Sequence, residues 1–304
     1  MTIGLPRAFL YYRYRILWET FFENLSIQTV TSPPTNREIL RKGTMYAIDE
    51  ACLSSKIYLG HVEALIGKCD YIFVPRISNF GVREILCTKF SALYDIVSNT
   101  FRERDFNILE YNVDVRKSEN EMSAFLKLGK AAGKKGRQVF FAYMMAKQAE
   151  KLEYEGNLQR QMILLKEKGL KVLVVGHGYN VYDAFVGEPV LNYLKSLGVT
   201  PIIAEIADRK KVRDLAADFS DTLPWVYNKE LVGAVLDYKD RVDGIILLSA
   251  FPCGPDSLVN EIIIRRVKDK PVLNLLIDSQ EAAGGVETRL ESFTDILHTV
   301  HSGA

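Results

Sequence analysis

The sequence predicts an α/β protein in which two Rossmann-like, doubly wound parallel-sheet domains are related by an internal repeat and joined by a helical bridge. Three observations lead to this prediction: short apolar segments alternate with amphipathic ones, the alternation recurs in the second half of the chain, and a long helical segment separates the halves. Apolar strands that alternate with helices indicate parallel sheets buried on both faces. Right-handed crossovers then make each half a doubly wound unit.

Short apolar segments predict four strands in each half of the chain. The strands of the first half lie at 2–5, 28–31, 71–75 and 107–111. Those of the second half lie at 171–175, 200–206, 244–249 and 271–277.

Helices are predicted between the strands because apolar residues recur there at helical spacing. Two such apolar faces are formed by Leu17, Phe21, Phe22 and Leu25 in the first half and by Val190, Leu191, Leu194 and Leu197 in the second. Further helices are predicted at 53–66 and 257–268, with a closing helix at 286–301.

The internal repeat consists of aligned residues at a nearly constant offset. The offset that aligns Ile3-Gly4 with Val175-Gly176 also aligns Ser26-Ile27 with Gly198-Val199. An offset longer by a single position aligns Lys56, Gly60 and Asp70 with Lys229, Gly233 and Asp243. Matched strand and helix patterns over such a length favour duplication over chance identity.

The predicted boundaries give a first Rossmann-like domain at 1–117, bridging helices at 118–169 and a second Rossmann-like domain at 170–304. The middle segment is rich in Ala, Lys, Glu, Met and Leu and has almost no turn residues after Gly136. This composition favours helices that bridge the domains over a flexible linker.

Composition excludes several classes of function. The net charge is +1, which gives no reason to expect nucleic acid or an anionic membrane as a partner. No apolar run approaches the roughly 18 residues that a membrane span needs, and the N-terminus lacks the pattern of a secretory signal. We therefore expect a cytoplasmic protein whose thiols stay reduced.

Three of the four cysteines, Cys52, Cys87 and Cys253, map to the carboxyl edge of the predicted sheets, where parallel α/β folds bind ligands. Cys69 precedes a strand at the opposite edge and is interpreted as structural. Three thiolates from distant loops could hold an iron–sulfur cluster, whereas zinc would favour four ligands in closer pairs. Small buried side chains are an equally good explanation of the three cysteines at this point.

Four more residues are candidates for contacts with a ligand. Arg7 and Arg76 lie beside prolines at predicted strand ends and could meet an anion, although solvated surface arginines would look the same. His177 could be a ligand or proton donor, or simply cap or pack. Asp256 lies in the turn after Cys253.

The loops after the first strands give only weak support for a nucleotide site. Neither contains a full G-x-G-x-x-G sequence, and the chain has no Walker A motif. A further loop, formed by Ser279-Gln280-Glu281 and Gly284-Gly285, follows the last predicted strand. It is expected to lie over the ligand cleft at the carboxyl edge of the sheets.

The sequence resembles the acyl-CoA dehydratase activase-related proteins, a family distantly similar to the cluster-bearing subunits of 2-hydroxyacyl-CoA dehydratases and benzoyl-CoA reductases. The resemblance spans nearly the whole chain. It rests on the segments IGLPRAFLYYRY, SPPTNREIL, DEACLSSKIYLGHV, DYIFVPRI, ILCTKF, VVGHGYNVYD, DGIILLSAFPCGPDS and ETRLESF.

The resemblance implies a [4Fe–4S] cluster between the two domains, with Cys52, Cys87 and Cys253 as its ligands. In the dehydratase relatives the fourth iron is open, and an ATP-hydrolysing activase supplies a low-potential electron. A larger double-cubane cluster would need six thiolates and therefore a second subunit. The sequence departs from the family pattern at Leu53-Ser54-Ser55, where a proline is expected, and it has no recognisable ATPase domain.

The leading hypothesis is therefore an iron–sulfur redox protein that accepts electrons from an ATP-dependent activase. It would act as a reductase or acyl-CoA dehydratase-like component on a small-molecule or acyl-CoA substrate, as a homodimer or hetero-oligomer. One alternative is a non-catalytic partner or electron carrier that docks through 118–169. Another is a cluster-free two-domain protein that binds a small molecule, and whether the chain is an enzyme stays open.

Overall fold

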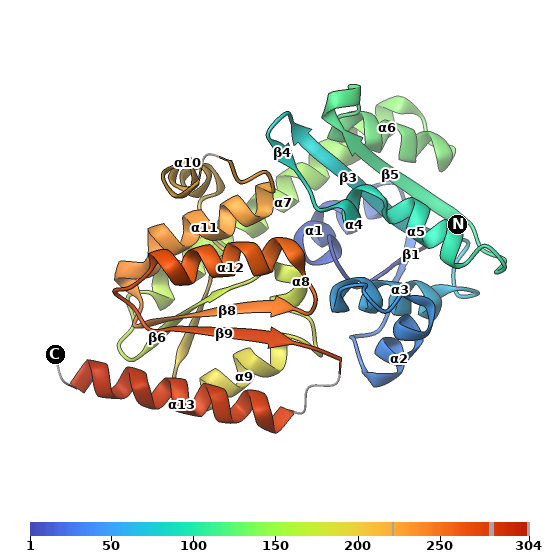
Figure 1. Ribbon diagram of the computed structural model, residues 1–304. Coiled ribbons are helices and arrows are strands. Elements are labelled where there is room, and N and C mark those ends of the chain that lie inside the picture. The colour runs from blue at the N-terminus through green and yellow to red at the C-terminus, as the bar shows by residue number, and fades with distance from the viewer. Residues whose placement is uncertain (221, 280–282, 303–304) are drawn as a thin grey trace. The chain divides into compact units, whose positions relative to one another are not determined.

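Figure 1 shows the computed structural model, which describes residues 1–220, 222–279 and 283–302. The chain forms two compact units, Met1–Tyr154 and Glu155–Ala304. The division falls inside α7 (Gly136–Leu164), within the segment predicted to bridge the halves. Gln280 and Glu281 of the predicted covering loop lie outside the described residues.

The first unit contains a sheet in which β1 lies between β2 and β3, and β3 also pairs with β5. These four strands are parallel, and they span Thr2–Leu5 (β1), Gln28–Thr31 (β2), Tyr71–Gly81 (β3) and Ile108–Asp114 (β5). The prediction for β3 was too short, because the strand continues to Gly81 and pairs in antiparallel fashion with β4 (Glu84–Ile85), which was not predicted.

Helices connect the strands of the first unit, and two of them begin at asparagine caps. Asn36 accepts hydrogen bonds from the backbone of α2, and Asn120 accepts one from the backbone of α6. The helices are α1 (Tyr11–Asn24), α2 (Arg37–Tyr46), α3 (Leu53–Leu65), α4 (Thr88–Ser91), α5 (Leu93–Thr100) and α6 (Glu121–Ala131), with a 3₁₀ turn at Val115–Lys117. Trp18, Phe21 and Phe125 are buried with Phe73 of β3, so aromatic packing holds α1 and α6 to the sheet.

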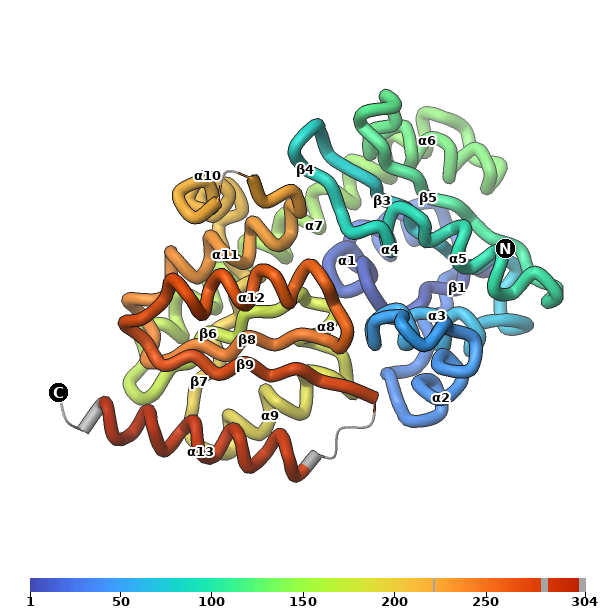
Figure 2. Tube along the Cα trace, viewed as in Figure 1, coloured from blue at the N-terminus to red at the C-terminus, as the bar shows by residue number. Residues whose placement is uncertain are grey.

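The second unit has the same parallel strand order, β7-β6-β8-β9, which can be followed in Figure 2. Its strands are β6 (Lys171–Val175), β7 (Thr200–Ile203), β8 (Gly244–Ala250) and β9 (Val272–Ile277). Its helices are α8 (Gly178–Val181), α9 (Glu188–Ser196), α10 (Arg209–Phe219), α11 (Val226–Tyr238), α12 (Gly254–Arg266) and α13 (Ala283–Ser302), with a 3₁₀ turn at Lys239–Arg241. Both units are therefore doubly wound, as predicted.

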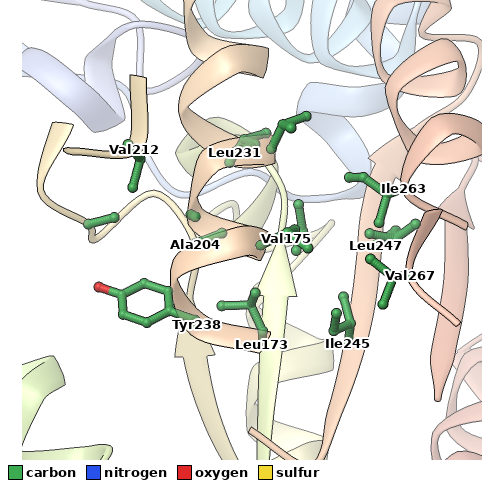
Figure 3. Close-up of a cluster of buried hydrophobic side chains, with 14 of the residues drawn as sticks. Leu173, Val175, Ala204, Val212, Leu231, Tyr238, Ile245, Leu247, Ile263 and Val267 are labelled. Atoms are coloured by element: carbon green, nitrogen blue, oxygen red, sulfur yellow. The ribbon is translucent and has the colours of Figure 1, made fainter. Parts of the chain in front are cut away.

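One hydrophobic cluster of the second unit lies between the sheet and the helices α10, α11 and α12. Leu173 and Leu247 from the strands pack with Leu231 of α11 and Ile263 of α12, and each is at most 4% exposed (Figure 3). α9 and α13 cover the other face of this sheet (Figure 1). Burial on both faces explains why every residue of β8 is buried.

Matching contacts in the two units bear out the internal repeat. Asp70 accepts a hydrogen bond from the backbone N–H of Thr2 at 2.7 Å, and Asp243 does the same for Lys171 at 2.7 Å. Each carboxylate thereby ties the residue before the third strand of its half to the first strand.

Two glycines, Gly60 and Gly233, also occupy equivalent positions. A Cβ atom at Gly60 would overlap the carbonyl oxygen of Ile39, and one at Gly233 would overlap that of Val212. The two glycines and the two carbonyl residues are related by the same offset, so α3 packs on α2 as α11 packs on α10.

The alignment of the first strands needs a correction. Ile3 pairs with Tyr71, the residue after Asp70, and Val172 pairs with Gly244, the residue after Asp243. Ile3 is therefore the structural equivalent of Val172, and not of Val175 as the sequence alignment predicted. The Ile-Gly and Val-Gly pairs resemble each other in sequence, but the register of the sheets makes different residues equivalent.

No helix in the described part of the chain has both the length and the apolar composition that crossing a bilayer requires.

Candidate functional site

Doubly wound folds bind ligands at the carboxyl edge of the sheet, next to the point where the strand order reverses. In the first unit β2 and β3 flank β1, and in the second unit β7 and β8 flank β6. The carboxyl ends of β1 and β6 therefore mark the position at which folds with this strand order usually bind ligands.

Cys52, Cys87 and Cys253 all lie at such an edge, each as the residue immediately before a helix. They precede α3, α4 and α12, and none of the three side chains forms a capping hydrogen bond with its helix. All three are partly exposed. Cys253 follows β8, Cys52 precedes the helix that leads back to the start of β3, and Cys87 follows β4, which pairs with the last residues of β3. The three cysteines therefore lie at the predicted edges.

Cys69 lies at the opposite edge, just before β3. Its thiol is 3.5 Å from the carbonyl oxygen of Leu65, and a Cβ atom at Gly4 would lie only 2.6 Å from the sulfur. Burial raises the pKa of the Cys69 thiol. Cys69 is partly exposed like the other three cysteines, but its sulfur lies against Leu65 and Gly4 at the start of the sheet.

A buried polar cluster adjoins Cys253 in the second unit. Asp256, in the first turn of α12, has its Oδ1 atom 2.9 Å from His177 Nε2 and accepts a hydrogen bond from Asn228 Nδ2 at 2.9 Å. The carboxylate also interacts with the side chain of Cys253. His177, Asn228 and Asp256 are 6%, 4% and 5% exposed, so the cluster is almost fully shielded from solvent.

These partners determine the ionisation of Asp256. Burial alone would raise the pKa of this carboxyl group, but His177, together with the hydrogen bonds from Asn228 and Cys253, holds the pKa below its ordinary value. Asp256 is therefore a carboxylate that orients the groups around it, including the side chain of Cys253.

Asn228 was missed in the sequence analysis, although the repeat contained a signal. Asn228 aligns with Ser55 at the same offset that relates Gly233 to Gly60, and the Ser55 hydroxyl lies 3.2 Å from Cys52 Sγ. The same position of the repeat thus contacts the sulfur of Cys52 directly in the first unit and reaches Cys253 through Asp256 in the second.

A second buried histidine, His61, lies in the first unit near the residues that follow β1 and β2. Its Nδ1 atom is 2.8 Å from Ser32 Oγ and its Nε2 atom is 2.9 Å from Thr35 Oγ1. The Ser32 hydroxyl also accepts a hydrogen bond from the backbone N–H of Arg7. Burial, with a smaller contribution from the charge of Arg7, lowers the pKa of His61 to about 3. Arg7 thus lies at the carboxyl edge as predicted, beside a histidine that is neutral at physiological pH.

Arg76 lies within β3, and not beyond its end, because the strand is longer than predicted. Its guanidinium group forms ion pairs with Glu110 at 2.9 Å and Asp95 at 3.5 Å and donates a hydrogen bond to Asn112. These partners account for the side chain as part of the link between β3, β5 and α5.

The proposed cluster ligands are distributed over both units, with Cys52 and Cys87 in the first and Cys253 in the second. Across the described residues, His, Cys, Asp and Glu side chains form no group of three or more that could hold a metal ion. The three-cysteine site stays a prediction.

Comparisons with known proteins give one match to a family. The family described as "CoA enzyme activase uncharacterised domain (DUF2229)" matches residues 2–206. No curated protein matches the sequence.

Among solved structures, the laminin-binding protein Lbp of Streptococcus pyogenes is 11% identical, with 97% of this chain and 98% of that chain covered and a TM-score of 0.28. ZnuA is 8% identical, with 98% of each chain covered and a TM-score of 0.31. A mutant of the laminin-binding adhesin Lmb from Streptococcus agalactiae is 13% identical, with 98% and 99% covered and a TM-score of 0.29. Likenesses at this level say nothing about function.

Proposed function

We propose that this chain, which belongs to the CoA enzyme activase family (DUF2229), is the iron–sulfur component of an acyl-CoA dehydratase or reductase system. The observation that carries the proposal is the position of three cysteines. Cys52, Cys87 and Cys253 each directly precede a helix at the carboxyl edge of a sheet, whereas Cys69 is packed at the other edge.

The donor set suits a [4Fe–4S] cluster with three protein ligands. Helix N-termini stabilise negative charge, so their position favours the thiolate form that iron requires. When bound, such a cluster supplies low-potential electron transfer and one iron without a protein thiolate. A double-cubane cluster would need cysteines from a second subunit, because this chain has four.

The polar neighbours of the cysteines would position them. Asp256 interacts with the side chain of Cys253 and is itself held by His177 and Asn228, so three buried groups restrict the rotation of that side chain. The Ser55 hydroxyl has the corresponding contact with Cys52 Sγ. Hydrogen bonds to ligating sulfur atoms also tune the reduction potential of a cluster.

The proposed partner is an ATP-dependent activase, because the family of this chain points to an activase system in which ATP hydrolysis supplies low-potential electrons. We place the protein in the cytoplasm, where reducing conditions keep cluster ligands as thiols. Substrate chemistry would take place at the iron that no cysteine binds.

Anaerobic purification and reconstitution, with quantification of iron and sulfide, test the proposal. We expect about four of each per chain and an EPR signal after reduction with dithionite. Cys52→Ser, Cys87→Ser and Cys253→Ser should each lower the iron content or change the EPR signal. Cys69→Ser is the matched control and should retain both. A chain that stays free of iron after reconstitution, or equal losses in all four variants, would contradict the proposal.

A further inference from the structure

A pocket of about 770 Å³ lies within the first unit, between the C-terminal end of α1 and the N-terminal end of α7. Its lining residues are Asn24, Leu25, Ser26, Lys134, Lys135, Arg137, Gln138, Phe140 and Phe141. Its volume is typical of sites that hold a small molecule or cofactor. None of these residues belongs to the cysteine sites or to the buried histidine clusters.

The pocket combines an apolar wall with three cationic side chains. Lys134, Lys135 and Arg137 line it, and no carboxylate does. Over the ranges that the structure describes, none of these three side chains forms an ion pair, whereas Arg76 in the same unit is paired with Glu110 and Asp95. Three adjacent cations without counter-charges favour an anionic ligand that carries more than one charge.

Two aromatic rings lie next to these cations. Phe140 and Phe141 are 51% and 66% exposed in the first turns of α7, whereas Val139 beside them is 1% exposed. Exposed aromatic rings provide flat apolar faces on which a planar ring can stack. A simple inorganic anion would make no use of these faces.

Polar groups in the pocket add hydrogen-bonding capacity. Gln138 accepts a hydrogen bond from the backbone N–H of Lys135 through Oε1, which leaves its amide N–H groups to donate. Asn24 donates to the carbonyl oxygen of Thr20 through Nδ2, which leaves its Oδ1 to accept. A donor and an acceptor beside aromatic faces suit a heterocyclic base better than a hydrocarbon chain.

We propose that this pocket binds a phosphorylated nucleoside, with the phosphates on Lys134, Lys135 and Arg137 and the base on Phe140 and Phe141. Lys and Arg are the usual phosphate-binding side chains, and stacking on aromatic rings accepts any planar base. The same chemistry is present in a free nucleotide and in the nucleotide end of a larger cofactor. Binding here needs no iron–sulfur cluster, so it stands apart from the redox role.

Isothermal titration calorimetry on the full chain tests the site with ADP, pyrophosphate, adenosine and coenzyme A. ADP should bind once per chain with a Kd below about 1 mM, and more tightly than pyrophosphate or adenosine. Coenzyme A binding more tightly than ADP indicates the nucleotide end of a larger cofactor, and the reverse order indicates a free nucleotide; both support the site.

Two variants separate the contributions of charge and stacking. The combined Lys134→Ala, Lys135→Ala and Arg137→Ala variant should raise the Kd for ADP at least about tenfold. Phe140→Leu with Phe141→Leu should raise it about fivefold and leave pyrophosphate binding unchanged. The control replaces the exposed residues Lys166, Lys168 and Lys210 by alanine and should leave the Kd unchanged, with circular dichroism and melting temperature confirming that every variant is folded.

Three outcomes would overturn the proposal. The first is the absence of saturable ADP binding to the wild-type chain. Folded charge and stacking variants that bind ADP as tightly as wild type would place the nucleotide elsewhere. Pyrophosphate binding as tight as ADP, with no effect of the phenylalanine changes, would identify a plain anion site.

Discussion

The two units bury a histidine at comparable depth but in opposite chemical surroundings. His61 contacts the hydroxyl groups of Ser32 and Thr35, and its pKa is lowered to about 3. His177 contacts the carboxylate of Asp256, whose pKa is held below its ordinary value. Hydroxyl groups provide no counter-charge for a buried imidazolium, so burial favours the neutral ring, whereas a carboxylate provides that charge. A repeated fold has therefore acquired different polar chemistry in its two copies.

The comparison also shows what both copies retained. Gly60 and Gly233 let one helix approach the backbone of another, and Asp70 and Asp243 tie the first strand to the third. Both contacts belong to the framework of the fold. Polar positions near the cysteines were free to diverge, as Ser55 and its counterpart Asn228 show.

The largest expected effect is the loss of stability when a side chain is added at Gly60 or Gly233, where both units have the same close helix packing. Gly60→Ala and Gly233→Ala should each destabilise the protein by about 3 kcal/mol or more, because the added methyl group overlaps a backbone carbonyl that cannot move alone. Urea denaturation measures the loss. Gly156→Ala is the control, since nothing closer than Arg160 Nη1 at 3.6 Å meets its Cβ, and it should stabilise α7 by about 0.5–1 kcal/mol. Tolerance of alanine at Gly60 but not at Gly233 would mean that the two helix pairs do not share a packing requirement.

An intermediate effect is expected for the carboxylate of the second unit. Asp256→Ala should lower the free energy of unfolding by about 2 kcal/mol, because His177 and Asn228 then stay buried without their partner. Asp256→Asn, which keeps one acceptor oxygen, should lose less. The exposed Asp295→Ala substitution serves as the control in the same urea titrations. Equal, small losses for Asp256→Ala and Asp295→Ala would show that the buried cluster adds little to stability.

The smallest effect concerns the neutral histidine and depends on pH. The folded-state pKa of His61 is about 3 and the ordinary value is 6.5, so the unfolded chain takes up the proton first as the pH falls. The stabilisation is complete above pH 6.5 and is lost progressively between pH 6.5 and 3. Between pH 7.5 and 5.5 the loss should be about 1.4 kcal/mol.

Comparison with His61→Gln isolates this contribution. The variant is less stable at every pH, but its free energy of unfolding should fall by about 1.4 kcal/mol less than that of wild type over the same interval. Urea denaturation at pH 5.5 and 7.5 measures both differences. Parallel pH dependences for the two proteins would show that His61 is not held neutral in the folded state.

Most strands were predictable because each forms from a local pattern. The limits of β1 and β6 agree with the predicted ranges, since a buried strand is a short apolar run with a polar or turn residue at each end. The limits of β2 also agree, although its residues are exposed or half-buried. The extension of β3 to Gly81 was not predictable in the same way. It depends on pairing with β5 and with β4, which is too short to give a pattern of its own.

The same distinction between local patterns and long-range pairing applies to the candidate site. The positions of Cys52, Cys87 and Cys253 follow from the alternation of strands and helices, so sequence alone could assign them to an edge. The partners of His61 and Asp256 could not be assigned, because hydrogen bonds join His61 to residues 26 and 29 positions away and Asp256 to residues 28 and 79 positions away. The partners of Arg76 could not be assigned either, because Asp95, Glu110 and Asn112 lie in elements that follow β3 in the chain.

The sequence by itself determined the duplicated α/β framework and the edge at which each cysteine lies, because periodicity and connection rules act over a few residues at a time. Only the tertiary structure decided which polar groups meet there, and that Ile3 corresponds to Val172 in the register of the sheets. Register and buried hydrogen bonds depend on packing between distant segments, and that packing left His61 among hydroxyl groups and His177 beside a carboxylate.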